Sequence, residues 1–280
     1  MMGMPVVGSS MAPTPQLGDP LPPALARYWE AIDGAGRFRE AAACFSDDTL
    51  YAVPPPDVVE VAPRIVTVGS AALLERFVER GHQPWRHVAV ICVATDSDAL
   101  VEGVLCDTEG RSIATYVCSA SFGPDGRISR YLAFSCPRAR DAIPTDVDAT
   151  GRPADAAEVV HRYFADLDSG HFADAAAHFS DDVLYSHPPY QHTEIEDQDR
   201  IEFRGRAALQ AGFERRGVAR FDHDVITSIQ NGPHCLFEGA VRGLPDDGTG
   251  SFISSLSLAH DGTIRRYVSF YCEPGIPTRK

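Results

Sequence analysis

The chain carries, near its middle, the side chain types that proton-transfer chemistry requires. Tyr185 and His187 are two residues apart on a short expected strand, so their side chains share one face. A histidine has an ordinary pKa of about 6.5 and can take or give a proton at neutral pH. Tyr163 could donate a hydrogen bond to a developing enolate or alkoxide oxygen. We therefore expect His187 to act as the base and Tyr163 as the oxyanion donor.

A second candidate pair lies further along the chain, where His223 and Glu238 fall on neighbouring expected strands. A histidine held by a carboxylate is a common acid–base unit, so we expect these two residues to support His187. Structural alternatives remain open for all four candidates. His187 precedes Pro188 and could cap a strand end, while Tyr163, His223 and Glu238 recur elsewhere in the chain and could serve the fold.

The recurrence is a duplication of most of the sequence. Residues 45–55 return as residues 179–189 with eight of eleven positions identical, at a spacing of 134. Residues 69–81 return as 205–217 with seven of thirteen identical, and residues 126–136 return as 262–272 with six of eleven, both at a spacing of 136. A self-match of this length and order indicates two copies of one domain and not a short solenoid repeat. The copies differ most at one position, where Val53 stands in the first and His187 in the second.

Composition excludes several classes of function. A net charge of −14 argues against nucleic acid and anionic membranes as partners, because both need a basic surface. Lys280 is the only lysine, so a lysine Schiff base, a pyridoxal-phosphate lysine and a Walker-type phosphate loop are excluded. No glycine-rich dinucleotide fingerprint follows an expected strand. We therefore expect no cofactor.

The cysteines and the N-terminus bear on localisation. Seven cysteines with no Cys-x-x-Cys spacing favour reduced thiols in a cytoplasm over a disulfide framework. The first 20 residues do not have the pattern of a signal peptide, and no apolar run approaches the roughly 20 residues of a membrane helix.

Each copy shows the same order of expected elements. Helices are expected at about 23–35, 38–45 and 69–81, and again at 154–169, 172–179 and 205–217, each set being followed by alternating or apolar strand segments. Helices followed by a meander predict an α+β layer fold, a curved antiparallel sheet wrapped on three helices around a conical pocket. The expected organisation is a disordered leader (1–22), a first domain (23–136), a linker (137–153), a second domain (154–274) and a tail (275–280).

Three motifs occur in the same order in both copies and resemble a known superfamily. The segments 162–167, 179–188 and 205–209 are similar to nuclear-transport-factor-2-like proteins, in particular to ketosteroid isomerases and SnoaL-like polyketide cyclases. The resemblance implies two tandem cone-shaped α+β barrels. It matches Tyr163 and Tyr28 to the oxyanion-donor tyrosine, His187 and Val53 to the position of the general base, and Ser254 and Cys118 to a second donor. The catalytic carboxylates of ketosteroid isomerases are therefore absent from both copies.

The resemblance also implies a pocket for a hydrophobic small molecule. We expect the substrate-binding residues to be Tyr185 and Tyr267, together with Tyr28, His87 and Glu102 of the first copy, which match Tyr163, His223 and Glu238 of the second. We expect the second copy to be active and the first to be impaired, replacing a dimer partner within the chain as an intramolecular pseudo-dimer that is open to further homo-oligomerisation. A metal site at His187, His192, Glu194 and Glu196 is disfavoured, because the spacing is not that of a helical metal motif.

These observations predict a cofactor-independent cyclase, isomerase or dehydratase that acts by acid–base catalysis on a carbonyl- or epoxide-bearing metabolite of polyketide type. A non-catalytic binding protein for a hydrophobic small molecule is the alternative, which the missing carboxylates favour. A tandem epoxide hydrolase is a further alternative, although neither copy shows a clear acidic pair.

Overall fold

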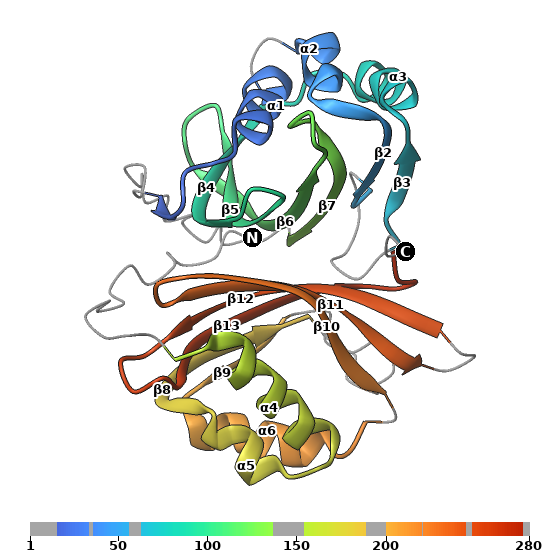
Figure 1. Cartoon of the computed structure of the whole chain (residues 1–280). Coiled ribbons are helices and arrows are strands. Elements are labelled where there is room, and N and C mark those ends of the chain that lie inside the picture. The colour runs from blue at the N-terminus through green and yellow to red at the C-terminus, as the bar shows by residue number, and fades with distance from the viewer. Residues whose placement is uncertain are drawn as a thin grey trace, which may run out of the picture.

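The computed structural model describes residues 16–33, 36–55, 63–136, 154–188, 200–219, 221–244 and 248–276. Within these ranges the first half of the chain forms one sheet with three helices, and the second half forms another (Figure 1). The expected linker, the acidic loop with His192, Glu194 and Glu196, and most of the expected leader and tail lie outside the described residues.

The first half begins with a short strand and continues through helices into a meander. Its elements are β1 (Leu17–Gly18), α1 (Pro23–Asp33), α2 (Phe38–Ala43), β2 (Phe45–Val53), β3 (Ile65–Val68), α3 (Ser70–Arg80), β4 (Trp85–Ala94), β5 (Asp98–Asp107), β6 (Ser112–Phe122) and β7 (Ile128–Cys136). The strand order across the sheet is β1-β4-β5-β6-β7-β2-β3.

The second half repeats this order without the first short strand. Its elements are α4 (Ala156–Asp168), α5 (Phe172–Ala177), β8 (Phe179–His187), β9 (Ile201–Arg204), α6 (Arg206–Arg216), β10 (Asp222–Asn231), β11 (His234–Leu244), β12 (Gly248–Leu258) and β13 (Ile264–Cys272). The strand order is β10-β11-β12-β13-β8-β9. The expected α+β class with three helices on each sheet is confirmed.

Two details differ from the expectation. Each sheet is mixed, because β2 pairs with β7 and β8 pairs with β13 in parallel, while the meander strands pair antiparallel. The crossover from the first strand to the meander runs through a helix, and this allows a parallel pair.

Residues 16–22, expected in a disordered leader, are ordered: Leu17 and Gly18 pair with Ile91 and Cys92 of β4. Gly18 has φ 82°, and a Cβ there would lie 2.1 Å from the Cys92 carbonyl oxygen, so only glycine fits.

The two sheets pack against each other through the faces that carry no helices (Figure 1). One apolar cluster joins them. From the first half it contains Ala52, Val90, Ile91, Val93, Leu100, Val117, Leu132, Phe134 and Cys136, and from the second half Ile229, Leu236, Ile253, Val268, Phe270, Cys272 and Ile276. Strands β6 and β12 are consequently buried on both faces over most of their length.

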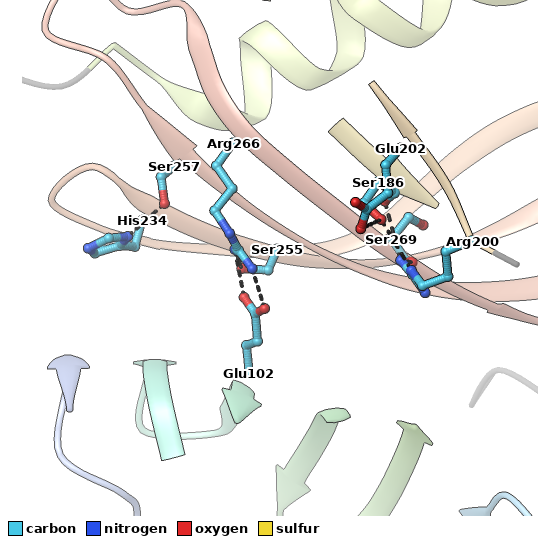
Figure 2. A network of polar contacts seen from close by, with 9 residues as sticks. All are labelled: Glu102, Ser186, Arg200, Glu202, His234, Ser255, Ser257, Arg266 and Ser269. Carbon is cyan, nitrogen blue, oxygen red and sulfur yellow. Dashed lines mark hydrogen bonds and ion pairs between the residues drawn. The ribbon is translucent and has the colours of Figure 1, made fainter. Parts of the chain in front are cut away.

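Ion pairs cross this interface in a reciprocal pattern. The guanidinium of Arg266 on β13 donates to the carboxylate of Glu102 on β5, at 2.8 Å for the first of two contacts (Figure 2). The guanidinium of Arg130 on β7 donates to Glu238 on β11, again at 2.8 Å for one contact. Arg130 and Arg266 occupy matching positions, as do Glu102 and Glu238, so the two halves meet as the subunits of a two-fold dimer do.

Candidate functional site

The interior of the second half is lined by aromatic rings from α4, β8, α6 and β13. On α4 the helical spacing of Val160, Tyr163, Phe164 and Leu167 places all four on the face that the sheet covers. The hydroxyl of Tyr163 lies 3.0 Å from that of Tyr185, and either can donate. Tyr185 stacks on Tyr267 with ring centroids 4.8 Å apart. The two tyrosines expected on one site, Tyr163 and Tyr185, are therefore brought together, with Tyr267 beside them.

A second hydroxyl pair lies behind Tyr267. The Ser254 hydroxyl is 3.1 Å from the Tyr267 hydroxyl and donates to the Ser269 hydroxyl at 3.0 Å. Ser254 is fully buried on β12. Ser254, which the family resemblance matches to a second donor, therefore carries a hydroxyl in contact with Tyr267.

His187 ends β8, on the same face as Tyr185, with ring centroids 5.5 Å apart. It is 7% exposed. Its Nδ1 lies 2.6 Å from the Pro188 carbonyl oxygen, and since a carbonyl can only accept, Nδ1 carries the proton and Nε2 the lone pair. Burial lowers the pKa of His187 to about 3, the charges of Arg216 and His223 acting in the same direction. The imidazole is therefore neutral at physiological pH.

His223 is held by an aspartate and not by the expected glutamate. Its Nδ1 lies 2.8 Å from an Asp168 carboxylate oxygen, and its backbone N–H donates to the same carboxylate at 3.0 Å. The ring stacks on Phe164 at 4.4 Å. Burial alone would raise the pKa of Asp168, but the hydrogen bond and charge of His223 outweigh it, and the net shift is downward.

The expected contact between His223 and Glu238 is corrected by strand alternation. Phe237 points into the interior of the second half, so its neighbour Glu238 points to the other face, where it meets Arg130. The same parity places Val101 in the interior of the first half and Glu102 at the interface with Arg266. Both glutamates lie on the opposite side of their sheets from the tyrosines.

The first half repeats most of this arrangement. The hydroxyls of Tyr28 and Tyr51 are 3.0 Å apart, and His87 Nδ1 lies 2.8 Å from Asp33. Cys118 stands where the second half has Ser254, and Val53 stands where it has His187. The imidazole beside the tyrosine pair is thus particular to the second half.

Sequence reasoning missed two kinds of residue at this site. Asp33 and Asp168 each follow the helix tyrosine by five residues in both copies, and this shared spacing was the signal that could have found them. Arg216, at the end of α6, acts on His187 through its charge. Its counterpart Arg80 is likewise kept in the first copy.

The described residues show neither a metal-binding cluster nor a membrane-spanning helix. Of the four candidate metal ligands only His187 is described, and among the described residues no group of three or more metal-binding side chains gathers. Within the same ranges, no helix has both the length and the apolar character to cross a membrane.

The burial of His187 predicts a pH-dependent stability. Its pKa falls from about 6.5 in an unfolded chain to about 3 in the folded protein. Between these two pH values the unfolded state binds more protons than the folded state. His187 therefore lowers the free energy of unfolding as the pH falls below about 6.5, by up to about 1.4 kcal/mol per pH unit. Urea denaturation between pH 7 and pH 4 should show a steeper loss for the wild type than for His187→Val.

The exposed His260 provides the control for this measurement. His260→Ala should keep the wild-type slope, because its imidazole is in solvent in both states. Parallel pH profiles for the wild type and His187→Val would show that His187 is not held neutral by burial.

Comparisons with known proteins bear on the second half most directly. Residues 160–267 match the SnoaL-like domain family, and no curated protein matches the chain. Among solved structures, the chain is similar to a candidate ketosteroid isomerase from Kribbella flavida at 20% identity (44% of this chain, 82% of that one, TM-score 0.32). It is also similar to a nuclear-transport-factor-2-like protein of unknown function from Burkholderia xenovorans at 16% identity (44% and 86%, TM-score 0.34).

A candidate polyketide cyclase from Sinorhizobium meliloti is similar at 16% identity (40% of this chain and 93% of that one, TM-score 0.32). Each of these structural matches covers less than half of the chain, and so does the family match, which runs from α4 to β13. Residues 160–267 of the second half are accordingly similar to the SnoaL-like domain family, and the first half repeats the fold of the second.

Proposed function

We propose that the second domain is a cofactor-independent cyclase, isomerase or dehydratase. Its substrate would be a hydrophobic metabolite with carbonyl or epoxide groups, of polyketide type. The family match supports the class of reaction, since SnoaL-like domains include isomerases and cyclases. The seven cysteines are all buried free thiols, and this supports a reducing, cytoplasmic compartment.

One observation carries the proposal: His187 is a buried, neutral imidazole beside a hydrogen-bonded tyrosine pair, and only the second domain has it. Its ring lies 5.5 Å from Tyr185, whose hydroxyl lies 3.0 Å from that of Tyr163. An imidazole and a hydrogen-bonded pair of phenol hydroxyls thus lie close together in the interior of the second domain. Proton abstraction next to a carbonyl needs both groups, one for the proton and one for the oxygen that becomes negative.

The proposed reaction proceeds in two proton transfers. His187 Nε2 takes a proton from the carbon next to the substrate carbonyl, and the electron pair moves to the carbonyl oxygen. A hydroxyl of the pair Tyr163–Tyr185 donates to that oxygen. The imidazolium then returns the proton to another carbon, or to a departing hydroxyl group in a dehydration. A base with a resting pKa of about 3 is weak, so the negative oxygen must form close enough to stabilise the imidazolium.

His223 and Asp168 would assist as a second acid–base unit. Asp168 holds the Nδ1 side of His223, and this orients the ring and leaves Nε2 for exchange. The aromatic faces of Tyr185 and Tyr267 would contact the apolar body of the substrate. Glu238 and Glu102 take no part, because both face the domain interface.

Metabolite profiling of a host from which the gene has been deleted tests the proposal. An unconverted intermediate should accumulate, and complementation with the wild-type gene should clear it. The accumulated compound then names the substrate. A strain in which no compound accumulates under conditions that express the protein would contradict catalysis.

A second function, binding without conversion, is supported by the packing of the same interior. Tyr163 is fully buried, Tyr267 is 3% exposed, and both contact Phe179. An interior lined by aromatic rings suits a hydrophobic ligand that is held and released unchanged. Native mass spectrometry of protein purified from its host separates the two functions: a binder should carry an intact metabolite that it does not convert on incubation.

A further inference from the structure

The His–Asp pair of the first domain is enclosed by three aromatic side chains. Trp29 stacks on the His87 ring with centroids 5.1 Å apart. Trp85 and Tyr116 meet it edge to face, each at 5.2 Å. On the remaining side Nδ1 faces Asp33.

The second domain has phenylalanine at all three of these positions. His223 is contacted by Phe164, Phe221 and Phe252 at 4.4, 5.5 and 5.9 Å. Around the same dyad, the first domain therefore has two indole N–H groups and one phenolic O–H where the second domain has none. The fold does not require these donors, because the second domain forms the same architecture without them.

Two of the three donors are buried and make no hydrogen bond of normal geometry with the residues that the structure describes. Tyr116 is 3% exposed, and its hydroxyl has no partner among the residues that the structure describes. Trp29 is 4% exposed, and its Nε1 lies near the Tyr131 hydroxyl but makes no hydrogen bond of normal geometry with any described residue. Buried polar groups in folded proteins are nearly always paired with protein or with ordered water, so these two donors could serve a bound ligand.

The guanidinium of Arg80 lies beside Trp85, one of the three aromatic residues around His87. The guanidinium of Arg80 is 5.6 Å from the ring centre of Trp85 and 5.9 Å from that of Phe77. It makes no ion pair with any residue in the described ranges. Its charge also acts on the Tyr28 and Tyr51 hydroxyls, opposing the rise in their pKa that burial causes. Arg80, Trp85 and His87 are all partly exposed, so this group of residues reaches the surface.

We propose that the first domain is a binding site for a hydrophobic carboxylate. The carboxylate would pair with Arg80 and accept hydrogen bonds from the donors around His87. The apolar body would lie against Trp85 and Val53, the residue that stands in place of His187. This site is separate from the proposed reaction in the second domain, and either can fail without the other.

The chain's two tryptophans make the site directly observable. Trp29 and Trp85 are the only tryptophans in the sequence, and both contact His87. Titration of the full-length protein with octanoate should therefore give a saturable change in intrinsic fluorescence. Octanamide has the same apolar body without the charge, and it should bind about tenfold more weakly or worse, because hydrogen bonds to charged groups are the strong ones.

Two variants and one matched control assign the effect to the site. Arg80→Gln should weaken octanoate binding about tenfold or more and remove the preference over octanamide. Tyr116→Phe copies the residue of the second domain and should fold normally, with octanoate binding weakened severalfold. Arg216→Gln, at the matching position of the second domain, should leave the fluorescence titration unchanged.

Three results would overturn the proposal. They are an absence of saturable fluorescence change with octanoate in folded protein, equal affinity for octanoate and octanamide, and an Arg80→Gln titration identical to that of the wild type. Circular dichroism of each variant distinguishes a loss of binding from a loss of fold.

Discussion

Replacing His187 with valine, the residue at the matching position of the first domain, is expected to lower turnover by about 10²–10⁴-fold. The reason is the loss of the atom that takes the proton in the proposed reaction, His187 Nε2, whose ring lies 5.5 Å from that of Tyr185, the hydrogen-bonding partner of Tyr163. Valine is accommodated at this place in the same fold, so the variant should keep its structure. Turnover is measured with the metabolite that accumulates in the deletion strain, using purified protein.

A matched control for this variant lies in the other domain. Val53→Ala alters the corresponding position in the first domain and should leave turnover of that metabolite unchanged. The loss in His187→Val should appear in kcat, because the interaction that is removed forms only as the proton moves. Full turnover by His187→Val would show that the chemistry, if any, depends on other residues.

Replacing Glu102 with glutamine is expected to cost about 3–5 kcal/mol in the free energy of unfolding. The carboxylate of Glu102 is 1% exposed and receives both contacts of the Arg266 guanidinium, which is 6% exposed (Figure 2). Removing one charge leaves the other buried at the domain interface without compensation, and this is the costly state. Urea denaturation at pH 7 measures the change.

The chain offers several comparisons for this substitution. Glu238→Gln removes the reciprocal pair with Arg130 and should cost a similar amount, since Glu238 is 5% exposed. The double variant Glu102→Met with Arg266→Met removes both charges and should recover most of the stability. Glu109→Gln removes a carboxylate that is 67% exposed and pairs with Arg111, and it should cost less than about 1 kcal/mol. Equal losses for Glu102→Gln and Glu109→Gln would show that the interface pair contributes no more than a surface pair.

Much of the fold could be predicted because its determinants are local and occur twice. The α4 stripe of Tyr163, Phe164 and Leu167 marks the buried face of a helix by its spacing, and alternating or apolar segments mark the strands of the meander. The presence of Tyr163 and Tyr185 at one site was expected from the same patterns together with the family resemblance, but their hydrogen bond was not. The parallel pairing of β8 with β13 could not, because strand direction depends on how the crossover folds back.

Residue types and internal repeats could be read from the sequence, and they show which residues can do chemistry and that the chain holds two copies of one fold. These features do not depend on tertiary contacts. The partners of the side chains do depend on them. Glu238 was expected to contact His223, but strand alternation points it to the other face of the sheet, where it pairs with Arg130. Asp168, which lies on another element 55 residues away, contacts His223 instead. A strand has two faces, and what lies against each is decided by packing between distant parts of the chain, which local sequence does not encode.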